Sequence, residues 1–437
     1  MAKRLTQIIL VALVLGIIVG AVVHEMYDAA TLQAISDGLS IVTKAFLRLI
    51  KMIIAPLVFA TLVSGIGHMG DTAALGRIGV RTILWFLAAS VLSLSLGILM
   101  VNFLQPGVGL GLPLPPVTAD AGIKAAEFTF GKFILDLIPT SIFDAMANNT
   151  ILQIVVFSIF MGVALTAIGE KGAPILRGIE SLMHLMLQIT GYVMLFAPFA
   201  VFAAVAAVVA VNGLEVLVTY VKFIGGFYLA LAILWALLIG LAVIMLGTKR
   251  GMALPSYIRA PVLLAFSTAS SEAAFPKTLE QLERFGVPNR IAGFVLPLGY
   301  SFNLDGSMMY CAFAVIFIAQ AYGIDLTITQ EITMLLILLV TSKGMAAVPR
   351  ASLVVIALTL TQFGIPEAGL LLILGVDQFL DMGRSATNVV GNAVATAVVA
   401  KWEGKLQEMQ PADGPMPEAP ANTIHDGRRG LNLDADA

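Results

Sequence analysis

The chain has 437 residues, of which 59% are hydrophobic and only 12% are charged, whereas a soluble domain carries about 25% charged residues. This composition excludes an ordinary soluble protein and predicts a chain that contacts lipid over much of its surface. The net charge of −2, with no basic patch that includes aromatic residues, excludes a nucleic-acid partner. The single Cys311 excludes an internal disulfide, and the four histidines lack metal-ligand spacing, so neither a metal centre nor another cofactor is predicted.

Long apolar stretches with few or no charges recur through the first 250 residues. They cover residues 8–23, 82–104, 151–168, 181–214 and 223–248. A bilayer core of about 30 Å needs roughly 20 helical residues, so these stretches predict transmembrane helices. The first stretch lacks a small-residue cleavage site before Glu25, which favours an uncleaved span over a secretory signal.

Lysines and arginines cluster at alternate ends of the predicted spans. The positive-inside rule puts these ends and both termini in the cytoplasm, and it puts the Pro/Gly-rich residues 105–116 outside. Residues 404–437 are predicted to be a disordered cytoplasmic tail. From Gln410 onward the composition is rich in Pro, Asp, Ala and Asn and has no apolar period.

Two segments in the C-terminal half fit re-entrant hairpins better than spans. Residues 255–285 and 330–362 each consist of a short apolar arm, a polar tip and a second arm, and each apolar arm is too short to cross the membrane. Irregular backbone at membrane depth is tolerated only where it is buried in protein or lines a cavity. Each hairpin precedes a helix with polar residues inside it, over 289–322 and 367–403. Duplicated units of this kind are typical of secondary transporters with a site at the membrane midplane.

The last of these helices carries charges where a membrane helix should have none. Its polar residues are spaced by 4, 3, 4 and 4 positions, so they share one helical face: Asp377, Asp381, Arg384, Asn388 and Asn392. An ionisable side chain at bilayer depth costs roughly 3 kcal/mol or more and usually marks a solute pathway. We expect the solute to bind at this polar stripe.

Four sequence motifs, taken in chain order, resemble those of one protein family. The tip FSTASSEAAFPK, the broken helix PLGYSFNLDGSMMY, the second tip TSKGMAAVP and the final helix GVDQFLDMGRSATNVVGNAVATAVVAKWE resemble the dicarboxylate/amino acid:cation symporters, the glutamate transporter family. The resemblance implies an all-α polytopic, inverted-repeat elevator transporter of the bacterial inner membrane, with eight transmembrane helices, two re-entrant hairpins and a homotrimeric assembly. It assigns residues 1–76 and 128–213 to the trimeric scaffold, and residues 77–104 and 214–403 to the moving transport unit.

The family's substrate residues have counterparts in this sequence. A guanidinium holds a carboxylate through a planar fork, and the matching arginine, Arg384, binds the acidic side chain of the substrate. Asp381 would receive the substrate ammonium; a plain dicarboxylate would instead bring a second acid against it, which is repulsive. The alternative for both residues is an ion pair within the helix, in which Arg384 is neutralised by Asp381 or Asp377. The remaining substrate candidates are Ser270, Ser271, Ser307, Ser385 and Asn388.

The family's cation sites also have counterparts. Hard cations prefer oxygen ligands, and an unwound helix at Gly306 is expected to free backbone carbonyls. The matching residues are Ser90, Asn303, Asp305, Ser342, Asn388 and Asn392, with the carbonyls of Gly299 and Ser301. A buried Asp305 could be neutralised by either Na⁺ or H⁺.

Three departures from the sodium-coupled pattern each remove a charge or a ligand. They are Leu304 where Met is usual, Asn392 where an Asp is usual, and Ala89 beside Ser90 where two hydroxyls are usual. They favour H⁺ coupling and leave Na⁺ open. Glu272 and Asp377 are the candidate proton carriers, and the alternative is that either acid is fixed and structural.

The sequence therefore predicts a symporter, not an enzyme, that imports L-glutamate or L-aspartate with H⁺ or Na⁺. Its partners are the small acidic solute, the lipid bilayer and further copies of the chain. The alternatives are a C4-dicarboxylate symporter for succinate, fumarate or malate, and an anion channel. A channel would line a continuous pore with charges or carbonyls, whereas here the polar groups gather at one depth.

Overall fold

The computed structural model describes residues 2–67, 72–109, 135, 137–213, 220–342, 351–374 and 376–412. Every regular element in these ranges is a helix, as expected where lipid offers no hydrogen bonds to the backbone. The predicted external loop beyond Gly109, residues 343–350 at the tip of the second hairpin and the tail beyond Ala412 lie outside the described residues.

The first 250 residues contain eight of the described α-helices. They are α1 (Ala2–Met26), α2 (Ala29–Gly67), α3 (Thr72–Leu104), α5 (Ile142–Ala147), α6 (Ile151–Ile168), α7 (Ala173–Met194), α8 (Ala197–Asn212) and α10 (Val221–Leu246). The predicted span over 181–214 differs from this result, because α7 ends at Met194 and α8 starts at Ala197 with Pro198 in its first turn. Proline lacks the N–H that would continue the preceding helix, which accounts for the break.

The C-terminal half contains the remaining helices. They are α11 (Thr248–Thr268), α12 (Phe275–Arg284), α13 (Asn289–Phe302), α14 (Asp305–Ala321), α15 (Ile328–Thr341), α16 (Ala351–Gln362), α17 (Leu370–Leu374) and α18 (Asp377–Trp402). Short 3₁₀ turns occur at Gly169–Gly172, Glu272–Ala274 and Glu367–Gly369.

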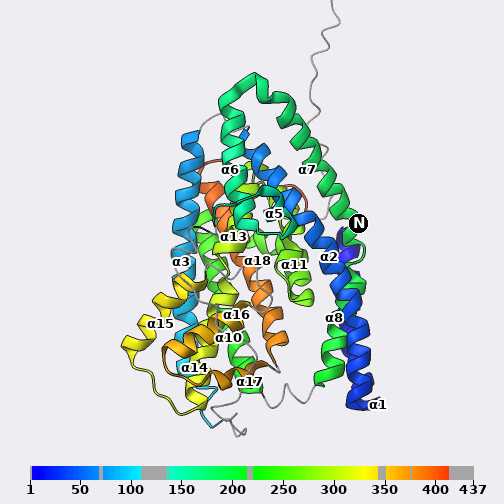
Figure 1. Cartoon of the computed structure of the whole chain (residues 1–437), viewed down its shortest axis with the longest axis vertical. Helices are drawn as coiled ribbons and strands as arrows, with labels where there is room; N and C mark the ends of the chain where they lie inside the picture. The colour runs from blue at the N-terminus through cyan, green and yellow to red at the C-terminus, as the bar shows by residue number, and fades with distance from the viewer. Residues whose placement is uncertain are drawn as a thin grey trace, which may run out of the picture.

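Helix α18 runs through the centre of the molecule (Figure 1). It contacts α10, α11, α13, α14 and α3, and every residue from Gly383 to Ala400 is buried. The faces of this helix outside the polar stripe are therefore covered by protein along that stretch. We call α3 and α10 to α18 the inner group; α1, α2, α6, α7 and α8 form the outer group, in which α8 packs on α1 and α2.

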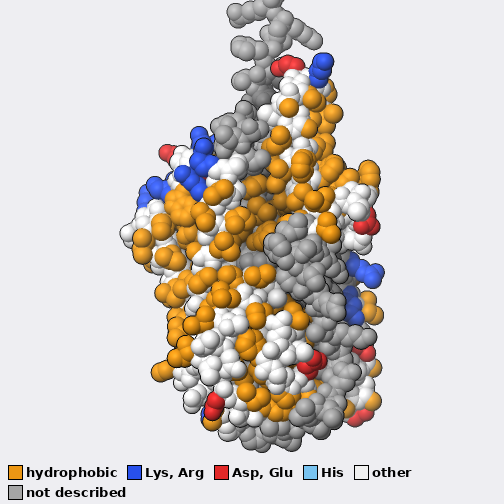
Figure 2. All heavy atoms as spheres, turned by 60° about the vertical axis from the view of Figure 1, so that its left-hand side comes forward, with side chains coloured by type: hydrophobic (Ala, Val, Ile, Leu, Met, Phe, Trp, Pro, Cys, Tyr) orange, Lys and Arg blue, Asp and Glu red, His pale blue; other side chains and the backbone are white. Residues whose placement is uncertain are grey.

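Five segments of the described chain are long and apolar enough to cross a membrane: Gln7–Met26, Gly76–Leu104, Ile151–Met194, Val221–Leu246 and Asn289–Ala321. Figure 2 shows hydrophobic side chains over much of one face, with lysines and arginines gathered in patches in its upper part and at its edges. An apolar exterior of this extent fits a chain solvated by lipid. The chain is thus an all-helical protein with several helices suited to a membrane.

Two contacting helices lie where the first hairpin is predicted, and the first of them is longer than the predicted arm. Helices α11 and α12 contact each other, and the tip between them contains Ala269 in the left-handed conformation at φ 49°. The arm begins at Thr248 instead of residue 255 and has 21 residues, with Pro255 and Pro261 inside it. At 1.5 Å per residue such a helix is about 31 Å long, although it is not among the described helices that are apolar enough to cross a membrane. The helix continues past both prolines and packs on α10 and α18.

The second predicted hairpin corresponds to α15 and α16, which also contact each other. Thr327 closes a capping box with Gln330 at the start of α15. The two hairpins approach the centre from opposite ends of the bundle (Figure 1). The base of the first lies at the C-terminal end of α18, because Arg250 Nη2 donates to the carbonyl of Gln407 over 2.7 Å.

The break in the predicted helix 289–322 lies at Asn303 and Leu304, not at Gly306. Gly306 is already inside the first turn of α14. A Cβ atom at Gly306 would lie 2.5 Å from the carbonyl oxygen of Arg384. The glycine therefore allows α14 to approach α18 closely, which is a different use from unwinding the backbone.

Residues 404–412 of the predicted disordered tail are instead folded against the inner group. The N–H of Gln407 donates to the carbonyl of Gly286 over 2.7 Å, and the N–H of Gln410 donates to the carbonyl of Arg284 over 2.8 Å. Tyr257 donates its hydroxyl to the Gln410 carbonyl. We call residues 403–412 the C-terminal strap; its backbone bonds fix it across the base of the first hairpin, although its composition suggested disorder.

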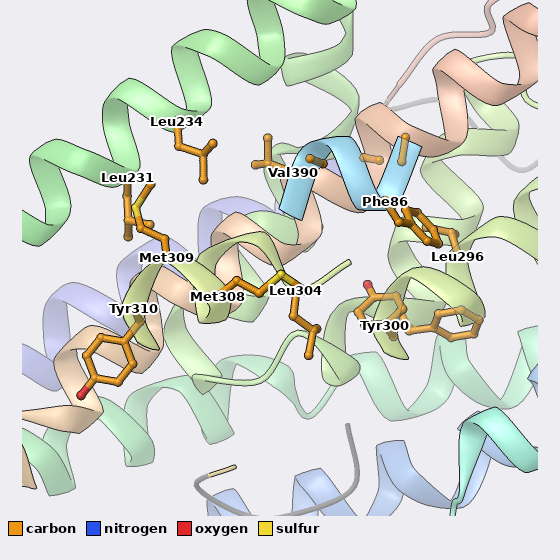
Figure 3. Packing of buried hydrophobic residues seen from close by; sticks show 14 of the residues in the cluster. Phe86, Leu231, Leu234, Leu296, Tyr300, Leu304, Met308, Met309, Tyr310 and Val390 are labelled. Carbon is orange, nitrogen blue, oxygen red and sulfur yellow. The ribbon is translucent and has the colours of Figure 1, made fainter. Parts of the chain in front are cut away.

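The core of the inner group is packed with large side chains. Met309 of α14 lies against Leu231 and Leu234 of α10, and Phe86 of α3 lies beside Leu296 of α13 (Figure 3). These side chains are buried. Interiors packed this closely transmit small displacements, so the polar groups of α14 and α18 are held in a defined geometry.

Candidate functional site

The five polar residues of α18 face the helices of the inner group, as the spacing predicts. Arg384, Asn388 and Asn392 are each at most 3% exposed, and Asp377 is 6% exposed. The side chain of Asp381, in contrast, is 34% exposed. Successive residues along the stripe are about 4.5 to 6 Å apart along the helix axis. We describe the site in three levels along this axis, at Arg384, at Asn388 and at Asn392.

At the first level, Arg384 is held by both neighbouring acids. Its Nη2 lies 2.9 Å from Asp381 Oδ1 and 3.4 Å from Asp377 Oδ1. Its Cζ lies 4.2 Å from the ring centroid of Tyr310, whose hydroxyl donates to Asp377 Oδ1 over 3.1 Å. The ion pair within the helix that the sequence left as an alternative is therefore present.

These contacts leave part of the guanidinium without partners. Nε and Nη1 of Arg384 are buried and have no hydrogen-bond acceptor among the described residues. A buried donor without an acceptor costs about 1–3 kcal/mol, more when it is charged. An acid group from outside the protein would satisfy these donors with charge-assisted hydrogen bonds.

At the second level, Asn388 joins α18 to the start of α14. Its Oδ1 accepts the N–H groups of Gly306 over 2.9 Å and Ser307 over 3.4 Å, and its Nδ2 donates to Ser307 Oγ over 3.1 Å. The first N–H groups of a helix have no partner inside it. The Asn388 side chain thus caps α14 from a neighbouring helix and brings Ser307, as predicted, to the same level.

At the third level, Asp305 is fully buried in a cluster of amides and a hydroxyl. Asp305 Oδ2 accepts from Asn303 Nδ2 over 3.0 Å, and Asp305 Oδ1 accepts from Ser93 Oγ over 3.2 Å. Asn303 Nδ2 also lies 3.2 Å from Asn392 Oδ1. We call Ser93, Asn303, Asp305 and Asn392 the Asp305 cluster.

Two glycines create room for this cluster. A side chain at Gly391 would collide with Asp305 Oδ2, and one at Gly299 would collide with Asn392 Oδ1. The Gly299 carbonyl, a predicted cation ligand, accepts the N–H of Asn303 over 2.8 Å. Three of the predicted cation residues, Asn303, Asp305 and Asn392, are therefore in one place, with the Gly299 backbone beside them.

The tip of the first hairpin packs beside this stripe. Ala265 and Ala274 form a buried cluster with Val389 of α18, the residue after Asn388. Ser270 Oγ accepts the N–H of Ala273 over 3.3 Å, so it closes the turn of the tip. Ser271 precedes the 3₁₀ turn that starts at Glu272, and both residues are half-buried.

Two of the other predicted residues, Ser90 and Ser342, form hydrogen bonds with carbonyls three or four positions earlier in the chain. Ser90 donates to the Phe86 carbonyl over 2.6 Å, and Ser342 donates to the Leu339 carbonyl over 3.4 Å. Ser385 is buried next to Arg384, and Ser301 Oγ is buried without a partner in the part of the chain that the structure describes. Asp377 starts α18, where a helix N-terminus favours an acid.

The sequence analysis missed two residues of the site, Tyr310 and Ser93. Ser93 lies three residues after Ser90 on the same face of α3, and this pair of hydroxyls was an available signal. No sequence pattern indicated Tyr310, because its contact with Arg384 joins α14 to α18, which are far apart along the chain. In the described residues there is no group of three or more His, Cys, Asp or Glu that could hold a metal ion.

Comparison with known proteins decides the family. The model of the sodium:dicarboxylate symporter family matches residues 5–402. The chain belongs to the sodium:dicarboxylate symporter family. The resemblance carried by the four motifs is confirmed, and the match extends to the first half of this symporter, which contains none of the four motifs.

Curated relatives of the symporter have two kinds of name. It is 40% identical over 406 residues to the proton/sodium-glutamate symport protein of Geobacillus stearothermophilus, covering 92% of this chain and 94% of that protein. It is 38% identical over 414 residues to the proton/glutamate-aspartate symporter of Bacillus subtilis, covering 94% and 97%. It is 39% identical over 412 residues to the C4-dicarboxylate transport protein of Laribacter hongkongensis, covering 92% and 90%.

Proposed function

We propose that this chain is a secondary symporter that imports L-glutamate or L-aspartate together with H⁺ or Na⁺. The observation that supports it is the first level of the site. Among the described residues, two buried donors of Arg384 have no acceptor, and the half-exposed Asp381 lies 2.9 Å from it. An acidic amino acid offers a carboxylate for the donors and an ammonium for Asp381.

The reaction is binding, desolvation and release, and it forms no covalent bond. Ser307 and Asn388 lie one level below Arg384 and offer polar groups for the second substrate carboxylate. The Asp305 cluster lies one level further and offers oxygens to the coupled cation. Because charged groups are costly to bury alone, closure of the site is favoured only when solute and cation neutralise it together.

The wider architecture in this proposal is that of an elevator. The inner group carries the solute, and the outer group is the scaffold through which three copies assemble in the bacterial inner membrane, with both termini cytoplasmic. Eight transmembrane helices and two re-entrant hairpins make up each copy. The approach of the hairpins from opposite ends of the bundle (Figure 1) supports the inverted repeat in this layout. Asp377, bonded to Tyr310 and Arg384, serves as a fixed acid, and Glu272 at the hairpin tip is the remaining proton-carrier candidate.

The test is uptake of labelled glutamate into proteoliposomes with a pH gradient or a Na⁺ gradient imposed one at a time. Accumulation driven by either gradient is expected, and unlabelled aspartate should compete. Absence of accumulation under both gradients would contradict the symport mechanism. Current through voltage-clamped membranes without any solute would favour the anion channel instead.

A C4-dicarboxylate symporter is the second candidate, supported by the Laribacter hongkongensis relative. Succinate has no ammonium, so it would bring a second carboxylate towards Asp381. We therefore expect succinate to compete weakly with glutamate uptake. Succinate that outcompetes both acidic amino acids would establish the second candidate and remove the proposed role of Asp381.

A further inference from the structure

A cavity of about 430 Å³ lies between α10, α11 and α18. Ligand pockets in proteins typically have volumes of about 300–1,000 Å³, so this cavity is large enough to hold a ligand. Helix α11 supplies most of its lining, α10 supplies Trp235 and Ile239, and α18 supplies Ala386 and Val390. The lining includes no residue that is predicted to bind the solute or the cation, so the cavity is separate from the three levels of the site.

The lining of this cavity is apolar except for one charge. Apart from Arg259, every residue that lines it is hydrophobic. The indole N–H of Trp235 donates to Thr387 Oγ1 over 2.8 Å, so it needs no polar partner from an occupant. Protein interiors contain few voids larger than a water molecule, and apolar walls offer water no hydrogen bonds. The lining therefore favours an apolar occupant, and acyl chains are the apolar material that surrounds a membrane protein.

The position of Arg259 gives the cavity a direction. Helix α11 starts at Thr248 at the base of the first hairpin, and Arg259 lies about 16 Å further along the helix axis. Helical side chains lean towards the N-terminus of their helix, so the exposed Arg259 side chain leans towards that base. Phe266 lines the cavity about two turns beyond Arg259. The cavity thus has a cationic end nearer the base and an apolar end nearer the tip.

We propose that this cavity binds one anionic phospholipid of the surrounding bilayer. One acyl chain lies along Trp235 and Phe266, and the phosphate pairs with the guanidinium of Arg259. Basic pockets between transmembrane helices are suited to acidic lipid headgroups. The lipid also packs against α18, the helix that carries the polar stripe. This inference goes beyond the proposed transport function and does not depend on which acidic solute is carried.

The test uses the tryptophan that lines the cavity. The chain has three tryptophans, and the other two, Trp85 and Trp402, pack on each other with ring centroids 5.7 Å apart. Replacing both with Phe leaves Trp235 as the fluorophore of the full-length protein. This protein is reconstituted in phosphatidylcholine vesicles with a rising fraction of brominated acyl chains, carried either by phosphatidylglycerol or by phosphatidylcholine. Bromine quenches an indole on contact, and we expect half-maximal quenching at about fivefold less brominated phosphatidylglycerol, since one basic contact favours the anionic headgroup.

Substitutions in the cavity test the two ends of the lipid. Arg259→Gln should remove the preference for phosphatidylglycerol, whereas Arg259→Lys keeps the charge and should retain most of it. Arg177→Gln is the matched control, because Arg177 is also exposed but lies on α7 and does not line the cavity. It should leave the preference unchanged. Val262→Phe narrows the apolar end and should reduce quenching by both lipids.

Thermal unfolding in detergent repeats the comparison without the tryptophan substitutions. Added phosphatidylglycerol should raise the unfolding temperature of the wild type more than phosphatidylcholine does, and Arg259→Gln should lose that difference. Equal quenching by the two brominated lipids, or a preference that persists in Arg259→Gln, overturns the proposal. Quenching by a brominated free fatty acid with none by phosphatidylglycerol assigns the cavity to another occupant and overturns it as well.

Discussion

At the scale of single residues, the site depends on a guanidinium that the described residues satisfy only in part. Both acids near Arg384 contact the same nitrogen, Nη2, while Nε and Nη1 are buried and have no acceptor in the described ranges. A purely structural ion pair gains little from leaving two buried donors unsatisfied. The arrangement is better explained by a third carboxylate that arrives with the solute.

Arg384→Lys tests the planar fork directly. Lysine keeps the positive charge beside Asp377 and Asp381 but replaces the fork with a point charge, so carboxylate binding should weaken while the fold is retained. We expect the KM for glutamate to rise by about tenfold or more. Uptake kinetics and the unfolding temperature are the measurements; an unchanged KM in a folded variant would contradict the role of Arg384.

Asp381→Asn should change the preferred solute. The amide no longer attracts an ammonium and no longer repels a second carboxylate, so glutamate uptake should fall while succinate competes better. Asp377→Asn is the matched control, because Asp377 is buried and bonded to Tyr310 and Arg384. That variant should lower the unfolding temperature without changing the ratio of glutamate to succinate uptake. Equal selectivity changes in both variants would argue against the assignment of the ammonium to Asp381.

The sequence predicted the site residues that lie on one helix better than those that meet across helices. The stripe from Asp377 to Asn392 follows from the helical period alone. The Asp305 cluster was found only in part, because Ser93 reaches Asp305 from α3, more than 200 positions earlier in the chain. No local pattern records such a contact, since it is decided by which helices pack together.

At the scale of elements, the close approach of α14 to α18 depends on Gly306. Gly306→Ala would place a Cβ atom 2.5 Å from the Arg384 carbonyl oxygen, so the two helices must separate. Overpacking of this kind typically costs about 1–3 kcal/mol. We expect a lower unfolding temperature and weaker glutamate uptake.

Gly240→Ala on α10 is the control for this variant, because no heavy atom lies within 4 Å of the Cβ that it would add. Alanine at that position should be neutral or slightly stabilising, since it favours the helix. A Gly306→Ala protein as stable as Gly240→Ala would show that the helix contact tolerates a methyl group.

The C-terminal strap predicts a sharp boundary for truncation. A chain ending at Ala412 keeps every described strap contact and should retain uptake. A chain ending at Trp402 loses Glu403, whose side chain binds Arg77 over 3.1 Å and Arg81 over 2.7 Å, and it loses the backbone bonds to Gly286 and Arg284. We expect it to unfold at a lower temperature. Equal unfolding temperatures for the two truncated proteins would assign the strap no stabilising role.

Elements whose signal lies in their own sequence were predicted well, and those set by packing were not. The capped start of α15 and the apolar α3 and α10 follow from composition and capping. The first hairpin was predicted to begin at residue 255, but α11 begins at Thr248 and continues through Pro255, and it packs on α10 and α18. The strap lacks an apolar period, and bonds to the base of the first hairpin fix it nonetheless.

At the scale of the whole molecule, the outer and inner groups meet across an apolar joint. A cavity of about 280 Å³ lies between α1 and α8 on one side and α10, α11 and α18 on the other. Its lining includes Leu13, Val205 and Val208 from the outer group and Phe266 and Met382 from the inner group. An apolar joint suits two groups that slide past each other.

Val208→Trp should obstruct that movement. The indole would fill the cavity between the groups and lower the maximal rate of uptake, while the affinity for aspartate should stay near that of the wild type. Val211 is on the same helix and 38% exposed, so Val211→Trp controls for the added bulk. Unchanged uptake by Val208→Trp would contradict a sliding joint at this cavity.

The most direct test of the central claim is a structure of the protein with L-aspartate bound. The account predicts that the side-chain carboxylate of the solute lies within hydrogen-bond distance of Nε or Nη1 of Arg384 and that its ammonium contacts Asp381. A bound molecule that leaves Arg384 paired only with Asp377 and Asp381, and sits away from both, would contradict it.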